Sequence, residues 1–212
     1  MIQLKRFGSV LDFGDVEQLR LEFREKHCVL LPMLLEPSLL DFLLQRLSQA
    51  QWRDMKHEGI GTEVVSDDPP ALSLLHFLAN RPAFLDAVGQ ISGCGGVTWF
   101  GGRVYRFIPN SGHHDSWHDD NMEGRQVGMS INLSERGYDG GVFELRERQS
   151  KRILIRVANT GLGDATLFRI SRDLKHQVTE VTGEMPKTAF AGWFQSGKQD
   201  LLSRLRGIPN GV

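Results

Sequence analysis

The hydrophobic pattern of this 212-residue chain changes its period part-way along. In the second half, apolar and polar residues alternate, most clearly over 126–133, where every odd position is apolar and every even position is polar or glycine. A period of two is typical of a strand with one buried face. Further short strands are expected at 97–108, 141–145, 152–157, 165–170, 177–181 and 188–194. Short strands separated by glycine-rich turns indicate an antiparallel sandwich or barrel.

The first half shows helical spacing instead. Apolar residues recur every three or four positions, and prolines stand where helices would begin. Asp15, followed three residues later by Gln18, resembles a capping box. Helices are expected at 15–26, 37–47, 71–79 and 82–91. We therefore expect one mainly β domain of the α+β class over 1–212, with a helical N-terminal support (1–96) packed on one face of a β core (97–195).

Charge and composition narrow the range of partners. The 25 basic and 26 acidic residues nearly cancel, which argues against a nucleic acid or an anionic membrane as partner. The N-terminal residues lack the features of a signal peptide, and no apolar run is long enough to span a bilayer. The two cysteines, Cys28 and Cys94, are expected to be reduced. These features predict a cytoplasmic protein that binds a small molecule or a peptide, and they leave the oligomeric state open.

Three residues that are far apart in the sequence have the chemistry of a metal site. His118 and Asp120 are two positions apart, and His176 follows much later. Two imidazoles and one carboxylate, with the other coordination positions open, suit non-haem Fe(II) that reacts with oxygen. The His-x-Asp spacing is not specific by itself, because this composition produces about one such pair by chance and His113 and Asp115 form a second.

The segment from 97 to 194 resembles the Fe(II)/2-oxoglutarate-dependent dioxygenases, most closely the prolyl-4-hydroxylase-like branch. The motifs that carry the resemblance are Tyr105-Arg106-Phe107, Gly112, Trp117-His118-Asp119-Asp120, Ile131-Asn132-Leu133-Ser134, Asp139-Gly140-Gly141-Val142-Phe143, Gly163-Asp164-Ala165-Thr166-Leu167-Phe168 and His176-Gln177-Val178, followed by Lys187 and Trp193. The resemblance implies a double-stranded β-helix core, which is jelly-roll or cupin-like, with the N-terminal helices on one face.

The resemblance places the iron ligands on His118, Asp120 and His176. In the family a glycine turn and then a Trp precede the first ligand, and this order matches His118 rather than His113. The residues of the second His-x-Asp pair, together with His114, would instead line the mouth of the site.

The cosubstrate 2-oxoglutarate is expected near Lys187. In the family a basic residue about ten positions after the distal histidine binds its far carboxylate, and Lys187 is eleven positions after His176. Asn132 aligns with a family position that contacts 2-oxoglutarate, and Tyr105 and Trp193 are expected to line the same pocket. The Arg-x-Ser pattern of many relatives is absent, which leaves open any contribution of a hydroxyl from this strand.

The activity implied by the resemblance is that of a dioxygenase. It would use Fe(II), 2-oxoglutarate and O2, with ascorbate as an accessory reductant, to hydroxylate a C–H bond of a small molecule or of an amino-acid or peptidyl substrate, releasing succinate and CO2. Asp120 argues against halogenation, because halogenating relatives lack this carboxylate. The prime substrate is not predicted. Residues expected to contact it are Arg103, His113 and Arg125, and several arginines near the mouth would suit a substrate with a carboxylate.

Two other functions are compatible with parts of the sequence. His114 and His118 enclose an acid in a spacing that superficially mimics the His-Glu-x-x-His motif of zinc hydrolases, but that motif requires a helix and Pro109 and Gly112 indicate a loop just before it. A cupin-like barrel that binds a metal without oxygenase activity is the second alternative. A test for reaction of the bound metal with O2 would distinguish this binding protein from an oxygenase.

Overall fold

The computed structural model describes residues 2–197 apart from residues 7, 11, 12 and 123. Its helices are α1 (Phe13–Lys26), α2 (Pro37–Ser48), α3 (Pro69–Ala79) and α4 (Pro82–Ser92), all in the regions expected from the spacing. Three of them begin at a proline, whose fixed φ and missing N–H suit a first helical turn. Because α1 begins at Phe13, Asp15 lies inside its first turn and is not the N-cap, so the expected capping box is wrong. None of the helices in the described residues has the length and apolar character needed to cross a bilayer.

Seven strands coincide with those expected in the second half of the chain. They are β6 (Val97–Phe107), β8 (Arg125–Asn132), β10 (Phe143–Glu147), β11 (Ile153–Val157), β12 (Ala165–Arg169), β13 (Leu174–Val178) and β15 (Lys187–Ser196). One boundary differs in an important way. The strand expected from residue 177 begins at Leu174, so that His176 lies within β13 and not before it.

Other strands were not expected. The longer ones are β3 (Cys28–Leu31), β4 (Trp52–His57), β5 (Gly61–Ser66) and β7 (His114–His118), and the two-residue ones are β1 (Gln3–Leu4), β2 (Ser9–Val10), β9 (Asp139–Gly140) and β14 (Val181–Thr182). The segment 1–96, expected as a helical support, therefore contributes strands as well as helices. β4 has few buried residues, and an exposed polar strand shows no apolar row from which it could be predicted.

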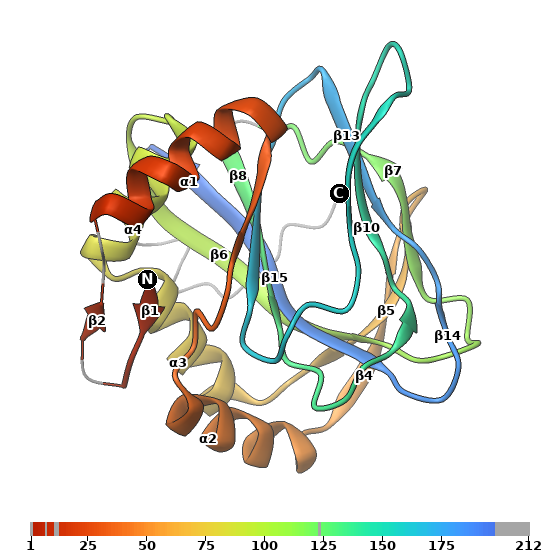
Figure 1. Ribbon diagram of the computed structural model, residues 1–212. Coiled ribbons are helices and arrows are strands. Elements are labelled where there is room, and N and C mark those ends of the chain that lie inside the picture. Colours follow the sequence, from red (N-terminus) through yellow and green to blue (C-terminus); the bar gives the residue numbers. More distant parts are fainter. Residues whose placement is uncertain (1, 7, 11–12, 123, 198–212) are drawn as a thin grey trace.

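Eleven strands form one large sheet in the order β11-β10-β13-β7-β5-β6-β15-β8-β12-β3, with β4 added beside β5. The pairs are antiparallel throughout. In Figure 1 the helices lie against one face of the layer formed by β6, β8 and β15, while β7, β10 and β13 face its other side. The result is the antiparallel barrel with helices packed outside it that the alternation predicts.

Two hydrophobic clusters follow from this arrangement. The larger one joins the helices to the outer face of the sheet and contains Val127, Met129 and Ile131 of β8, with Leu133 just after its end. The smaller one lies inside the barrel and is rich in aromatic residues, including Tyr105, Phe143 and Phe168. Ser130 and Asn132, on the other face of β8, line the interior cavity, as expected.

Candidate active site

Strand pairing brings two of the three expected metal ligands together. β7 and β13 are antiparallel neighbours, and His118 lies directly opposite His176 in their register. Directly opposite residues of an antiparallel pair have Cβ atoms about 4.5–5.5 Å apart. The two imidazole rings accordingly have centroids 4.2 Å apart, although the residues are far apart in sequence.

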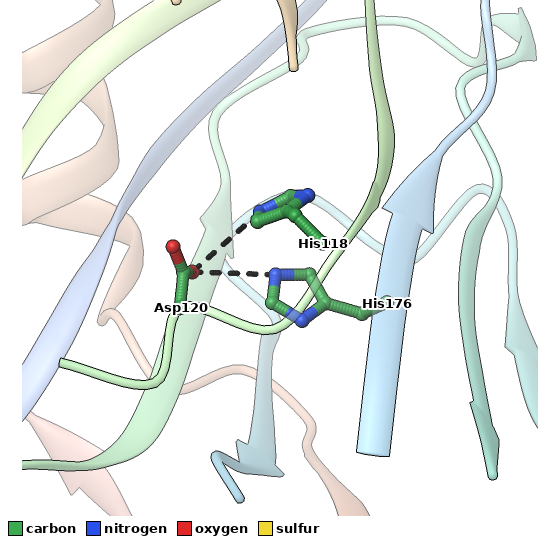
Figure 2. Close-up of side chains that lie close together, drawn as sticks. All are labelled: His118, Asp120 and His176. Carbon is green, nitrogen blue, oxygen red and sulfur yellow. Dashed lines mark ion pairs between the residues drawn. The ribbon is translucent and has the colours of Figure 1, made fainter. Parts of the chain in front are cut away.

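Asp120 completes the group from the loop that follows β7. Its backbone has a φ of 50°, in the left-handed region that Asp tolerates better than most residues. Its Oδ2 atom lies 3.3 Å from Nε2 of His176 and 3.7 Å from Nε2 of His118. Figure 2 shows the carboxylate facing both imidazoles. One donor atom from each of the three residues lies within 4.8 Å of the others, so a single metal ion would reach all three.

Neighbouring groups fix the orientation of these side chains. Nδ1 of His118 lies 2.6 Å from the carbonyl oxygen of Ser116, which can only accept, so Nδ1 carries a proton and Nε2 is free to bind a metal in the neutral ring. The indole Nε1 of Trp193 donates to Oδ2 of Asp120 at 2.6 Å. Partners of this kind set the tautomer and direction of metal ligands in proteins.

The charges of the group favour an anionic carboxylate. Burial alone would raise the pKa of Asp120, but its contacts with His118 and His176 hold that pKa well below its usual range. Burial lowers the pKa of His176, so this ring is neutral as a ligand must be. Burial acts in the same direction on His118, but the hydrogen bond and charge of Asp120 outweigh it and raise the pKa of His118.

The donor set fits Fe(II) and does not fit the zinc-hydrolase alternative. Two imidazole nitrogens and one carboxylate oxygen approach from neighbouring backbone segments, which is the ligand set of non-haem iron oxygenases. The hydrolase motif needs a helix, whereas His114 to His118 form the strand β7. In a strand these two histidines are about 13 Å apart, too far to share a metal ion.

The three residues line a cavity of about 1020 Å³ inside the barrel. Alternate residues of β15 point into it, from Lys187 through Ala189 and Ala191 to Trp193. The two alanines leave space in the middle of the strand, and the larger side chains stand at its two ends. This volume lies at the upper end of the range for ligand pockets and has room for more than one small molecule.

A sequence model of the 2OG-Fe(II) oxygenase superfamily matches residues 102–195, a segment that contains all three expected metal ligands and Lys187. Residues 102–195 therefore form a domain of this superfamily. The Fe(II)- and 2-oxoglutarate-dependent oxygenase inferred from the sequence is thereby confirmed at the level of reaction class. No curated protein matches the chain in sequence.

Solved structures show the same fold. A Pseudomonas putida prolyl-4-hydroxylase is 16% identical, with a TM-score of 0.66 over 86% of this chain and 100% of that one. A prolyl hydroxylase from Trichoplax adhaerens is 15% identical, with a TM-score of 0.63 over 86% and 90%. The α-ketoglutarate-dependent epimerase SnoN from nogalamycin biosynthesis is 14% identical, with a TM-score of 0.63 over 95% and 92%. These similarities confirm the double-stranded β-helix fold.

At one end of the oxygenase cavity stands Lys187, which is 7% exposed. Its Nζ donates to the carbonyl oxygen of Gly141 at 2.7 Å and lies 5.6 Å from the ring centroid of Tyr138. Burial lowers the pKa of Lys187 to about 8. The ammonium is therefore held in a largely dry environment, where an added carboxylate would stabilise it.

Two tyrosines line the cavity of the oxygenase near this lysine. Tyr105 was expected there, and burial raises its pKa well above the usual value. Tyr138 was not expected, although it directly precedes the Asp-Gly-Gly motif, and burial raises its pKa to about 12. Both phenols are neutral donors at ordinary pH. Neither hydroxyl makes a hydrogen bond to another residue of the described part of the chain.

Asn132 and His113 both form hydrogen bonds with the backbone of this chain. Asn132 lines the cavity, but its amide donates to the carbonyl oxygens of Thr160 and Gly161, at 2.6 and 3.3 Å, and accepts from the backbone of Ser134. Only one acceptor position of this amide is left for a ligand. His113 is not among the residues that line the cavity, and its Nδ1 accepts from the backbone N–H of Ile108 at 3.0 Å. The side chain thus closes the turn before β7.

A β-bulge brings Asp115 into the cavity of the oxygenase. His118 lies opposite His176, but Asp115 lies opposite Val178, so two residues of β7 face one residue of β13. In a regular strand, residues three apart point to opposite faces. Because of the bulge, Asp115 and His118 both line the cavity. Burial and the charge of Glu63 raise the pKa of Asp115.

Proposed function

We propose that this oxygenase hydroxylates a C–H bond of a small molecule or of an amino-acid or peptidyl substrate, with conversion of 2-oxoglutarate and O2 to succinate and CO2. The observation that carries the proposal is the convergence of three donors on one point of the cavity wall. His118, Asp120 and His176 would hold the iron, which supplies oxygen activation coupled to decarboxylation of 2-oxoglutarate.

The residues around the ligands prepare them for this role. The proton on Nδ1 of His118 is held by the carbonyl of Ser116, so that the lone pair of Nε2 points to the shared centre. The indole of Trp193 holds the carboxylate of Asp120. The only polar atom of the Trp193 side chain, Nε1, donates to this carboxylate. We therefore propose that Trp193 orients Asp120 and does not make the expected contact with 2-oxoglutarate.

Lys187 is our candidate for the anchor of the far carboxylate of 2-oxoglutarate. A buried ammonium paired with a carboxylate forms a strong, charge-assisted hydrogen bond when its other protons also have partners. Gly141 already accepts one of these protons. The hydroxyls of Tyr105 and Tyr138, as neutral donors on the same cavity, would satisfy the second oxygen of that carboxylate.

Apolar walls keep water from the reacting groups. The ring centroids of Phe168 and Phe143 lie 4.7 and 5.9 Å from that of His176. Both phenylalanines line the cavity. Excluding water from this region strengthens each charged interaction inside it.

Among the reactions that enzymes of this fold catalyse, hydroxylation is the best supported for this protein. The epimerase SnoN shares the fold, so the fold does not by itself select the outcome. The carboxylate of Asp120 occupies the ligand position that a halogenating enzyme leaves to chloride. The substrate class is also open, because the Trichoplax structure contains a peptide and a SnoN structure contains nogalamycin RO.

Incubation of the iron-loaded protein with 2-oxoglutarate, O2 and a panel of amino acids, short peptides and metabolites tests the proposal. The expected result is succinate release matched one-to-one by a substrate that gains one oxygen atom, measured by mass spectrometry. The Asp120→Ala protein serves as the control without metal. Succinate release with a product that gains no oxygen would contradict hydroxylation and support another oxidative outcome. Iron bound in wild type without any cosubstrate-dependent absorption band would support the structural-barrel alternative.

A further inference from the structure

We propose that Arg125 and Arg103 form a second anion-binding position in the cavity, and that it binds the carboxylate of a small organic acid that is the prime substrate. This inference rests on the proposed function, because it assumes that 2-oxoglutarate occupies the part of the cavity next to Lys187. Arg103 on β6 and Arg125 on β8 come from the two strands that flank β15, and both guanidinium groups lie near the ring of Trp193.

Lys187 and the two arginines are too far apart to bind the same carboxylate. Lys187 and Trp193 point to the same side of β15 and are six residues apart. Six residues of an extended strand span about 20 Å between their backbones. A carboxylate held by Lys187 therefore does not reach the arginines beside Trp193, which are available to a second carboxylate.

Arg125 is a partly buried cation with few partners among the described residues. Its side chain is 18% exposed, and its guanidinium carbon lies 3.6 Å from the ring centroid of Trp193. The guanidinium makes no hydrogen bond to any residue that the structure describes. Its nearest carboxylate oxygen is Oδ1 of Asp120, at 3.7 Å from Nη1. A planar group with several N–H donors buried in this way requires acceptors from a ligand or from water.

A metal ion would weaken the ion pair between Arg125 and Asp120. Asp120 is a proposed iron ligand, so its negative charge would be shared with a divalent cation. A carboxylate bound beside Arg125 would then supply the negative charge that Asp120 no longer offers in full.

Arg103 is held in place by the hairpin that covers the cavity. Its Nε donates to Oε1 of Glu63 on β5, whose side chain has no exposed surface, and its Nη2 lies 3.2 Å from Nε2 of His57 at the end of β4. Its guanidinium carbon is 6.0 Å from the ring centroid of Trp193. Arg103 lines the cavity with Arg125, so the hairpin places a second guanidinium beside the same indole.

The chemistry of these groups favours a carboxylate. Guanidinium presents paired N–H donors that match the two oxygens of a carboxylate in one plane. Asp115 also lines the cavity and would repel an anion placed beside it, but it would accept from an ammonium or hydroxyl of the same molecule. A free amino acid or hydroxy acid combines these features, whereas a residue inside a peptide has no free α-carboxylate.

Isothermal titration under anaerobic conditions tests this inference by binding alone. The protein is loaded with Fe(II) and 2-oxoglutarate and titrated with L-amino acids, their des-amino acids and their carboxamides. The variants are Arg125→Gln, Arg125→Lys and, as a matched control, Arg156→Gln, which removes an exposed arginine paired with Glu144 outside the cavity. The absorption band of iron-bound 2-oxoglutarate shows in each variant that the site is assembled.

We expect at least one acid to bind wild type at least tenfold more tightly than its carboxamide. Arg125→Gln should remove that advantage, Arg125→Lys should retain part of it, and Arg156→Gln should leave it unchanged. Equal binding of acid and amide, full affinity in Arg125→Gln, or no binding by any acid would each overturn the inference. Absence of the 2-oxoglutarate band in wild type would instead refute the proposed function, so the two failures are distinguishable.

Discussion

Replacing Lys187 with Met removes the proposed anchor of 2-oxoglutarate while retaining most of the volume of the side chain. Lys187 is 7% exposed, and its ammonium is hydrogen-bonded to the carbonyl of Gly141 at 2.7 Å. A buried carboxylate left without its partner costs about 3–5 kcal/mol. Since about 1.4 kcal/mol corresponds to a factor of ten, the apparent Kd for 2-oxoglutarate should rise by about two to three and a half orders of magnitude.

The pH dependence of binding provides a second signature of the same residue. Burial lowers the pKa of Lys187 to about 8 in the protein without ligand. A bound carboxylate stabilises the ammonium and keeps it protonated to higher pH. Affinity is therefore fully present below about pH 8 and falls as the pH rises above it, by up to about tenfold per unit. In Lys187→Arg this loss should disappear, because guanidinium stays charged over this range.

Anaerobic titration with 2-oxoglutarate, followed by the metal-to-ligand charge-transfer band at pH 7, 8 and 9, measures both effects. Iron content determined on the same samples should be equal in wild type, Lys187→Met and Lys187→Arg, since no ligand atom is changed. Shorter 2-oxo acids without a second carboxylate should bind wild type poorly and lose little in Lys187→Met. Unchanged affinity in Lys187→Met, or the same alkaline loss in Lys187→Arg, would refute the assignment of Lys187 as the anchor.

Three further predictions concern the ligands, their support and the fold. His176→Ala should bind no iron at ordinary concentrations, while His113→Ala should keep one Fe(II) per chain; metal analysis showing the reverse would contradict the ligand assignment. Trp193→Phe keeps an aromatic ring but removes the N–H donated to the metal-binding carboxylate, so iron affinity should fall by about 10–100-fold with the fold intact; equal affinity would show that this hydrogen bond does not position the ligand. Gly61→Ala would place a Cβ 1.7 Å from a backbone carbonyl oxygen of β7 and should lower the free energy of unfolding by about 1–3 kcal/mol in urea, whereas Gly95→Ala, with open space around it, should change it little.

The elements that the sequence predicts well are those with a strong local signal. The alternation over 126–133 correctly divides β8 into a face that packs on the helices and a face that includes Ser130 and Asn132. Prolines at the starts of α2, α3 and α4 locate these helices to within two residues. Each of these signals depends only on neighbouring residues, so no knowledge of the fold is needed to interpret it.

Elements stabilised mainly by distant partners were missed. β4 is largely exposed and has no apolar row, and it forms because β5 pairs with it and also with β6 and β7. The short strand β7 follows a turn and contains both polar and aromatic residues, and its partner β13 is far away in sequence. Such strands have little preference of their own, and the sheet around them determines their conformation.

The sequence by itself determined the chemical inventory of the site: two imidazoles and a carboxylate in a family motif, and a lysine at the expected distance from the second histidine. Only the tertiary structure decided which other groups share that space. The register of β7 with β13 places His118 opposite His176, and the bulge beside it brings in Asp115. The packing of distant strands likewise puts Tyr138 near Lys187 and Arg125 on Trp193. Periodicity shows which face of one segment is buried, but register and loop conformation, which determine the groups across from it, depend on contacts between segments that are remote in the chain.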